Sequence, residues 1–266
     1  MNTTDHPLTI NHYTFGETDL AARRLSLLAA AYDQSSREFL AAWARPGVDH
    51  AIDLGCGPGH TTRLVQATIR PRRLTGLDAS DKLLKQAIAD VPEAAFVRHD
   101  VTRSPFPCEV ADFLFCRFLL THLHDPGAAL RAWSDASLPG ATLLIQETAT
   151  LASDDPTFQR YYTLVGELQA GYGQALHIGA HLDGIVLGSG WKLTASELRV
   201  VEQDARVMAR LHAMNIRTWG QDALARKLFD CDEITRVRDA LAAVAAGERA
   251  APPVRNALRQ IVATPA

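Results

Sequence analysis

The sequence predicts an α/β fold built on a doubly wound, mostly parallel sheet of seven strands. Short apolar segments alternate with amphipathic helical segments between residues 50 and 147, a pattern typical of parallel sheets joined by helical crossovers. A glycine-rich turn, AIDLGCGPGHTTRL, follows the first of these segments. We therefore expect a Rossmann-like sheet, preceded by a helical cap and interrupted by a helical insertion after the fifth strand.

The cap is predicted over residues 17–45, where apolar side chains recur at helical spacing up to Arg45-Pro46-Gly47. Apolar, strand-length segments then predict the sheet. The expected strands are residues 50–54, 73–78, 94–100, 110–116, 141–147, 191–203 and 257–264.

Helices are expected between these strands. One covers residues 61–69, and a second is capped by Ser80 and places Leu83, Leu84, Ala87 and Ile88 on one face. A third covers residues 126–137, with Asp125 as its N-cap and Pro126 at its first position. Two helices should follow residue 203, the second with an apolar stripe at Ile234, Val237, Leu241 and Val244.

Residues 148–182 are rich in tyrosine and histidine and follow the carboxyl end of a strand, the edge at which open α/β sheets bind ligands. We expect this segment to be a lid or pocket wall. The chain is predicted to be a single domain over residues 1–266. Its parts are the cap (1–45), a cofactor-binding core (46–147), the lid (148–182), and the remaining strands and helices (183–266).

Composition excludes some classes of partner. With 47% hydrophobic residues and a net charge of −3, the chain offers no general electrostatic attraction to nucleic acid or to an anionic membrane. The four cysteines are scattered without metal-ligand spacing, which suits a reducing cytoplasm. Neither a signal-peptide pattern nor a membrane-spanning apolar run occurs. We expect a cytoplasmic protein, monomeric or homodimeric, without a nucleic-acid or membrane partner.

The glycine turn predicts a ligand close to the backbone. A strand, a glycine-rich turn and a helix place unpaired backbone N–H groups beside a crevice. Gly55, Gly57 and Gly59 follow Asp53 in the pattern D-x-G-x-G-x-G, and His60 stands where a dinucleotide fingerprint has its third glycine. The pattern therefore favours another adenosine cofactor over a nicotinamide dinucleotide.

Acidic residues end the next two predicted strands. Asp78 is placed to accept hydrogen bonds from two ribose hydroxyls, and Asp100 could meet an exocyclic amine. Each could alternatively cap the turn that follows it. Three aspartates at three successive strand ends, around one glycine turn, favour the cofactor interpretation.

Together, AIDLGCGPG, LTGLDAS, FVRHDVTRSPF, ADFLFCRFLLTHLHDPGAAL and LPGATLLIQET resemble the successive motifs of class I S-adenosylmethionine-dependent methyltransferases. HYTFGETDLAARRL and RNALRQIVAT are similar to a bacterial branch that acts on small molecules. The resemblance implies S-adenosylmethionine as cofactor and a small organic acceptor as partner. In this resemblance, Asp53 and Gly59 shape the glycine loop, and the methionine portion of the cofactor lies over Gly55, Cys56 and Gly57. Asp78 holds the ribose, Ala79 lies beside the adenine, and Asp100 and Val101 contact the edge of the adenine. Cys116 and Arg117 flank the sulfonium, and Arg24 and Tyr13 close over the carboxylate end of the cofactor.

Methyl transfer to a protonated acceptor calls for a base near the fourth strand. His122 is the first candidate, with local packing at a turn as its alternative, and Glu147 is the second, with a solvated strand end as its alternative. Glu147, Asp154 and Asp155 are too loosely spaced to predict a metal site. We expect O-methylation first, with N- or C-methylation open. The alternatives are a protein that binds the cofactor without transferring methyl, and a nicotinamide oxidoreductase.

Overall fold

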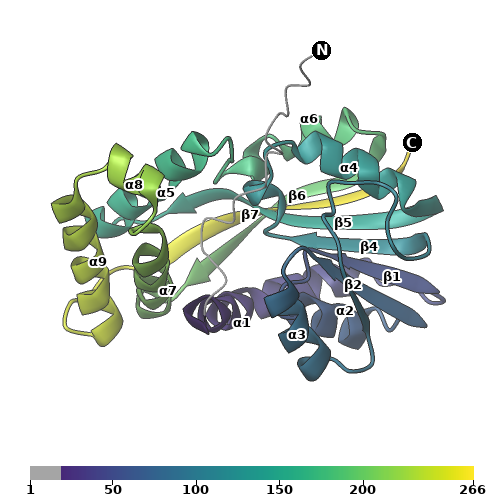
Figure 1. Cartoon of the computed structure of the whole chain (residues 1–266), viewed down its shortest axis with the longest axis horizontal. Helices are drawn as coiled ribbons and strands as arrows, with labels where there is room; N and C mark the ends of the chain where they lie inside the picture. Colours follow the sequence, from purple (N-terminus) through teal and green to yellow (C-terminus); the bar gives the residue numbers. More distant parts are fainter. Residues whose placement is uncertain (1–18) are drawn as a thin grey trace, which may run out of the picture.

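The structure is a computed structural model that describes residues 19–266, with side chains from residue 23 onward. Its sheet has seven strands in the order β3-β2-β1-β4-β5-β7-β6, and β7 alone runs antiparallel to its neighbours (Figure 1). This is the predicted doubly wound, mostly parallel sheet. The strands are β1 (His50–Leu54), β2 (Arg73–Asp78), β3 (Ala95–Arg98), β4 (Ala111–Arg117), β5 (Ser137–Ala152), β6 (Trp191–Gln203) and β7 (Val254–Pro265).

The helices lie on both faces of the sheet. In Figure 1, α1, α2 and α3 lie below it and α4 and α6 above it, whereas α5, α7, α8 and α9 form a separate group at the far ends of β5 and β7. The helices are α1 (Asp19–Ala42), α2 (His60–Thr68), α3 (Asp81–Asp90), α4 (Pro126–Asp135), α5 (Pro156–Gly171), α6 (Leu182–Leu187), α7 (Ala205–Trp219), α8 (Ala223–Leu228) and α9 (Cys231–Ala246), with short 3-10 turns η1 (Leu120–His122) and η2 (Ile178–Ala180).

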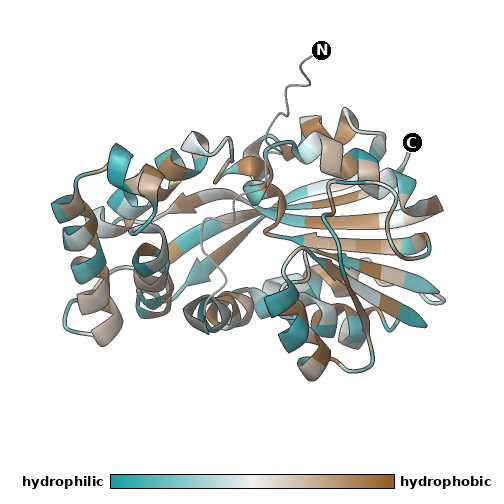
Figure 2. Ribbon diagram, in the orientation of Figure 1, coloured by the Kyte–Doolittle hydropathy of each residue, from teal (hydrophilic) through white to brown (hydrophobic). Residues whose placement is uncertain are grey.

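The central strands are apolar because both of their faces are covered. Along β4, Phe113 and Phe115 pack toward α1 and α2, while Leu114 and Cys116 pack toward α4 and α6. Figure 2 shows the resulting apolar colouring along β4 and β5. Strands with two buried faces hold the carboxyl ends of β1, β2 and β4 in fixed positions.

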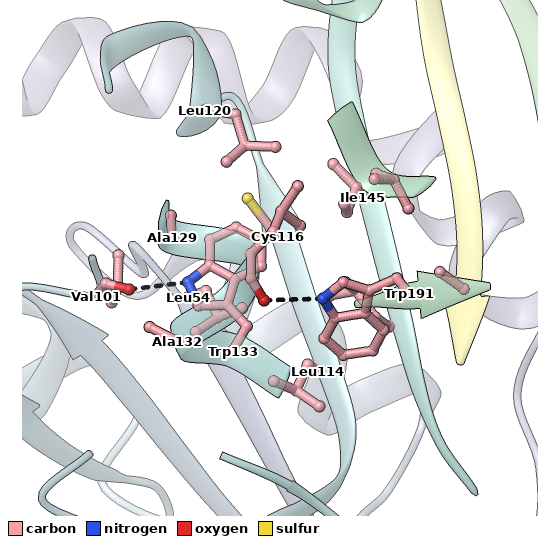
Figure 3. Packing of buried hydrophobic residues seen from close by; sticks show 14 of the residues in the cluster. Leu54, Val101, Leu114, Cys116, Leu120, Ala129, Ala132, Trp133, Ile145 and Trp191 are labelled. Carbon is pink, nitrogen blue, oxygen red and sulfur yellow. Dashed lines mark hydrogen bonds between the residues drawn. The ribbon is translucent and has the colours of Figure 1, made fainter. Parts of the chain in front are cut away.

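Two buried tryptophans join α4 to the loop after β3 and to the start of β6 (Figure 3). The indole N–H of Trp133 donates to the carbonyl of Val101 at 3.0 Å, and that of Trp191 donates to the carbonyl of Leu130 at 2.8 Å. Buried indoles need such partners. The first bond fixes the backbone at Val101, in the loop that follows β3.

The structure corrects several element boundaries. Strand β5 continues past Glu147 to Ala152, because Thr150, Leu151 and Ala152 pair with β7. Three helices, not two, follow β6, since the short α8 lies between α7 and α9. Ile88 was expected on the buried face of α3 and is 55% exposed, although Leu83, Leu84 and Ala87 are buried as expected.

Two predicted helix caps are confirmed. The hydroxyl of Ser80 accepts a hydrogen bond from the amide of Leu83 at 3.3 Å, and Asp125 accepts one from Ala128 at 2.8 Å. Across the described residues, no helix combines the length and apolar character that crossing a bilayer requires.

Candidate active site

A cavity of about 440 Å³ opens at the carboxyl ends of β1, β2 and β4. Its walls come from the glycine loop, from the loops after β2, β3 and β4, and from α1, α5 and α7. It therefore has a cofactor half, at the glycine loop, and an inner half between α1, α5 and α7.

The glycine loop forms the floor of the cofactor half. Gly55, Gly57 and Gly59 all have positive φ, as the turn from β1 into α2 requires. A Cβ added at Gly57 would meet no atom within 4 Å, whereas one at Gly55 would come 2.8 Å from Leu119. Gly57 therefore leaves open space in the cavity, and Gly55 is needed for close packing.

Asp53 supports this loop from behind. Its Oδ2 accepts hydrogen bonds from the hydroxyls of Thr61 and Thr62, both at 2.7 Å. Burial raises its pKa to about 6, and the two hydroxyls act in the opposite direction. Asp53 is 1% exposed and does not line the cavity, so it ties β1 to the first turn of α2.

Asp78 lines the cavity at the end of β2. Its Oδ2 accepts a hydrogen bond from the amide of Gly57, and its Oδ1 accepts one from the amide of Ser80, both at 2.9 Å. A carboxylate oxygen has more than one acceptor direction. Asp78 thus holds the loop and faces the cavity at once.

The loop after β3 forms the adjoining wall. Asp100 and Val101 line the cavity, together with Ala79. Asp100 also caps its own turn, because its Oδ1 accepts from the amide and the hydroxyl of Thr102 at 3.0 and 2.7 Å. Asp100 therefore caps its turn and also lines the cavity.

Cys116 and Arg117 lie next to each other at the end of β4, but only one of their side chains lines the cavity. Arg117 lines the cavity and donates from Nη1 to the hydroxyl of Ser36 at 3.0 Å. Cys116 is fully buried in the cluster under α4 and does not line the cavity. The expectation that both residues flank the cofactor is wrong for the Cys116 side chain, because successive side chains of a strand point to opposite faces.

Glu147 was expected to face the crevice as a possible base, but it lies outside the cavity. It is fully buried, is absent from the cavity wall, and accepts hydrogen bonds at Oε1 from the amides of Leu119 and Leu120, both at 2.7 Å. Burial raises its pKa to about 8, against these amide bonds. Glu147 therefore holds the loop after β4 from behind, and it neither contacts the cavity nor ends a solvated strand.

That loop presents Phe118, Thr121 and His122 to the cavity. Phe118 has a φ of 54° and packs edge-on against Tyr32, with ring centroids 5.1 Å apart. Residues held at positive φ cluster at ligand sites. His122 lies with its Nδ1 3.5 Å from the amide nitrogen of Gln169, and burial, followed by the nearby charge of Arg24, lowers its pKa to about 3.

Arg24 is 4% exposed and lines the cavity from α1. It is therefore a buried arginine and not a surface residue of this helix. Tyr13, which was expected beside it, lies outside the described residues.

The inner half brings together polar side chains that sequence reasoning did not assign. Asn215 donates to the hydroxyl of Tyr161 at 2.8 Å, and His212 stacks on Tyr161 with ring centroids 4.2 Å apart. Asn256, from β7, also lines the cavity and donates to the hydroxyl of Tyr32 at 2.8 Å. A signal was available, because His212 and Asn215 interrupt the apolar face of α7 one turn apart. Among the aromatic and histidine residues noted in the insertion, Tyr161 lines the cavity, whereas Tyr162, Tyr172, His177 and His181 do not.

No group of three or more His, Cys, Asp or Glu side chains suited to a metal ion occurs within the part of the chain that the structure describes. Asp154 and Asp155, which lie near Glu147 in the sequence, pair instead with Arg255 and Arg249.

The sequence of the core has known relatives. Residues 52–145 match the family model described as a methyltransferase domain. Trans-aconitate 2-methyltransferase of Paracidovorax citrulli is 33% identical over 112 residues, and that of Klebsiella pneumoniae is 37% identical over 78 residues. The alignments cover 42% and 29% of this chain, and 43% and 30% of the two relatives. The chain thus matches less than half of the length of these curated relatives.

The fold has solved counterparts. Phosphoethanolamine N-methyltransferase 2 of Haemonchus contortus, in complex with phosphomonomethylethanolamine and S-adenosylhomocysteine, has a TM-score of 0.54 at 15% identity, over 94% of this chain and 60% of that chain. The cyclase SpnF has a TM-score of 0.53 at 16% identity, over 87% and 80%. At these identities the likeness concerns the fold alone.

Proposed function

We propose that this chain, a class I methyltransferase by its sheet topology and by the domain at residues 52–145, transfers a methyl group from S-adenosylmethionine to a small organic acceptor. One observation carries the proposal. A single cavity begins at the glycine loop and Asp78 and continues past the end of β4 into a separate inner half. Such a cavity can hold a cofactor and an acceptor end to end.

The residues of the cofactor half fit an adenosyl cofactor. Open space above Gly57 admits a ligand against the backbone, and the carboxylate of Asp78 beside it suits a ribose diol. The loop at Asp100 and Val101, fixed by Trp133, suits the edge of an adenine. When bound, the cofactor supplies a methyl group already activated on a sulfonium.

The protein's own task is then mainly orientation. Holding two reactants in line can contribute about 7–11 kcal/mol to lowering a barrier. His122 lies in the cavity wall, but an imidazole whose pKa is lowered to about 3 is a weak proton acceptor. We therefore assign His122 to acceptor positioning, and Glu147 to holding the loop that carries His122.

The acceptor class follows from the cavity and from the relatives. The inner half is bordered by side chains of α1, α5 and α7, and a concave, largely apolar space of this kind suits a small molecule. The curated relatives are named for trans-aconitate, a small organic acid. Both observations support a small-molecule acceptor.

Calorimetric titration with S-adenosylhomocysteine and, in parallel, with NADH tests the cofactor assignment. We expect binding of S-adenosylhomocysteine and none of NADH, and the opposite result would overturn the proposal. Incubating the protein with S-adenosylmethionine and a library of small acceptors should then produce S-adenosylhomocysteine. If the cofactor binds but no acceptor is methylated, the fold serves other chemistry here, as it does in the cyclase SpnF.

A further inference from the structure

We propose that β6, the strand at one edge of the sheet, pairs antiparallel with β6 of a second copy of this chain, so that two copies form a symmetric dimer with one continuous sheet. This inference goes beyond the proposed function and does not depend on it. Three observations lead to it: the regular outer edge of β6, the apolar side chains exposed on this strand, and a charge pattern that complements itself about Leu198.

Strand β6 ends the sheet, and among the described strands its partner is β7. Natural sheets usually protect an edge with a bulge, a proline or a short strand, because unpaired N–H and C=O groups are a template for another strand. In β6 the register shift lies early, between Leu193 and Ala195. From Ala195 to Gln203 the pairing with β7 is regular and the segment contains no proline. This stretch therefore presents a regular row of backbone groups on the side away from β7.

Two apolar side chains are exposed in the middle of this stretch. Leu198 is 54% exposed and Val200 is 60% exposed, and the period of two along a strand places them on the same face of the sheet. Glu197 and Arg199 lie on the other face, where both border a second cavity, of about 330 Å³, between the sheet and α1. Arg199 pairs there with Glu38 of α1 at 2.9 Å. The strand thus carries apolar residues on one face and opposite charges on the other.

A two-fold axis at Leu198 brings complementary residues of two copies opposite each other. Leu198 then meets the partner's Leu198, and Val200 meets the partner's Ser196 on the same face. On the other face, Glu197 meets the partner's Arg199, and the symmetry forms this charge pair twice. Residues directly opposite in an antiparallel pair have Cβ atoms about 4.5–5.5 Å apart, so apolar pairs and opposite charges stabilise the pairing.

Neighbouring registers are less favourable. An antiparallel pair matches residues whose backbone groups have the same orientation, so the axis must pass through a residue. An axis at Glu197 places two glutamates opposite each other, and an axis at Arg199 does the same with two arginines. An axis at Val200 places Leu198 opposite the partner's Glu202. Like charges directly opposite destabilise a pair of strands, so the charge pattern selects the axis at Leu198.

The charges select the register more than they supply affinity. Arg199 and Glu38 are 55% and 48% exposed, and ion pairs at such exposure contribute little to stability. A guanidinium has five N–H donors, so the bond to Glu38 leaves donors for a carboxylate of the partner. The affinity is expected from the backbone hydrogen bonds between the two strands and from burial of Leu198 and Val200.

The pairing closes at two copies. Each chain has one β6 edge, and a two-fold axis uses both of them. The opposite edge of the sheet is β3, which covers only Ala95–Arg98. A strand as short as this is one of the ways in which natural sheets protect an edge. The expected assembly is therefore a dimer and not a growing filament.

Size-exclusion chromatography with light scattering tests the dimer over a wide range of protein concentration. We expect the wild type to reach twice the mass of the single chain. Leu198→Lys, which places two ammonium groups opposite each other at the axis, should weaken dimerisation at least about 10-fold. Ile88→Lys is the matched control, because Ile88 is 55% exposed on α3, beside β2 and β3 at the other edge of the sheet. It should leave the dimer intact.

Two charge reversals test the register. In a homodimer of Glu197→Arg, an arginine faces the partner's Arg199, and in a homodimer of Arg199→Glu, a glutamate faces the partner's Glu197. Each variant alone should therefore dimerise at least about 10-fold more weakly than the wild type. Mixing the two variants in equal amounts should restore dimers, because every charge at position 197 then faces an opposite charge at position 199. Native mass spectrometry, with one variant carrying a tag, identifies the mixed dimer.

The contrary outcomes are distinct. A wild type that stays monomeric at every concentration would overturn the proposal. So would a dimer that Leu198→Lys and both charge reversals leave intact, since its interface would lie elsewhere. Failure of the mixed variants to associate would overturn the register, and assembly beyond two copies would overturn the symmetric pairing. Circular dichroism and thermal unfolding establish that each variant is folded. None of these measurements uses a cofactor, so their outcome is separate from that of the proposed function.

Discussion

The carboxylate of Asp78 accepts a hydrogen bond from the amide of Gly57 at 2.9 Å, across the gap between the ends of β2 and β1. One side chain thus shapes the glycine loop and faces the cavity above it. Losing Asp78 should therefore affect both loop geometry and cofactor contacts.

We expect Asp78→Ala to weaken S-adenosylhomocysteine binding by about 10- to 100-fold, because two charge-assisted contacts are lost. Asp78→Asn, which keeps an oxygen acceptor for the Gly57 amide, should lose less affinity. Isothermal titration calorimetry measures both. An Asp78→Ala protein with wild-type affinity would contradict the cofactor role of this residue.

Gly57→Ala should weaken cofactor binding, since its Cβ would project into the open space of the cavity. Gly140 offers a matched control. Its φ is 77° and that of Gly57 is 53°, and a Cβ added at either glycine would meet no atom within 4 Å. Both alanine variants should lose about 1 kcal/mol of stability from backbone strain. Only Gly57→Ala should lose affinity for S-adenosylhomocysteine, and equal loss in both would indicate a general folding effect.

Glu147 should make the protein less stable as pH rises. Its pKa is raised from 4.5 to about 8 by burial, so the folded protein binds more protons than the unfolded chain between these values. This contribution to stability is fully present below about pH 4.5 and is lost as pH approaches 8. Glu147→Gln keeps an oxygen for the amides of Leu119 and Leu120 and removes the titration.

Between pH 5 and pH 8, we expect the unfolding free energy of Glu147→Gln to rise by about 1–2 kcal/mol relative to that of the wild type. This change is smaller than the full pKa shift would give, because the two amide hydrogen bonds favour the charged form of Glu147. Urea unfolding at the two pH values measures the change. A difference between the proteins that does not vary with pH would show that Glu147 titrates normally.

His212 should produce the opposite pH dependence. Burial lowers its pKa from 6.5 to about 3, so the unfolded chain binds more protons between these values. The contribution of His212 to stability is present above about pH 6.5 and is lost as pH falls toward 3. His212→Gln, which can still pair with the hydroxyl of Tyr162, should reduce the slope of unfolding free energy against pH by up to about 1.4 kcal/mol per unit between pH 4 and 6. Denaturant unfolding across this range measures the slope, and an unchanged slope would contradict the burial of a neutral imidazole.

His122→Ala should lower turnover about 10-fold or more while leaving S-adenosylhomocysteine affinity near wild type, because the side chain borders the inner half. The pH profile separates positioning from proton transfer. With a pKa of about 3, His122 should leave no inflection in turnover between pH 5 and 8. An inflection near 6.5 that disappears in His122→Ala would instead identify a general base.

The local elements could be predicted from the sequence with good accuracy. Strands at residues 50–54, 73–78 and 191–203 have the predicted bounds, and Ser80 and Asp125 cap their helices as expected. These features depend on short-range chemistry: apolar periodicity, a side-chain oxygen near free amides, and a glycine turn. The seven-stranded sheet follows from their alternation.

The grouping of Gly57, Asp78, Asp100 and Val101 around one cavity could also be predicted, since they follow strand ends that parallel pairing brings to one edge. Their contacts with a cofactor stay a prediction. Cys116 is the exception, because a shift of one residue along a strand moves a side chain to the other face.

By itself, the sequence determined where strands end and helices begin, because those signals lie within a few residues of each other. The tertiary structure decided which side chains are desolvated together. It buried Glu147 behind the loop after β4, brought Arg24 close to His122, and assembled Asn215, Tyr161 and Asn256 from three separate elements. Burial and charge proximity depend on packing between distant segments, so no local pattern encodes them.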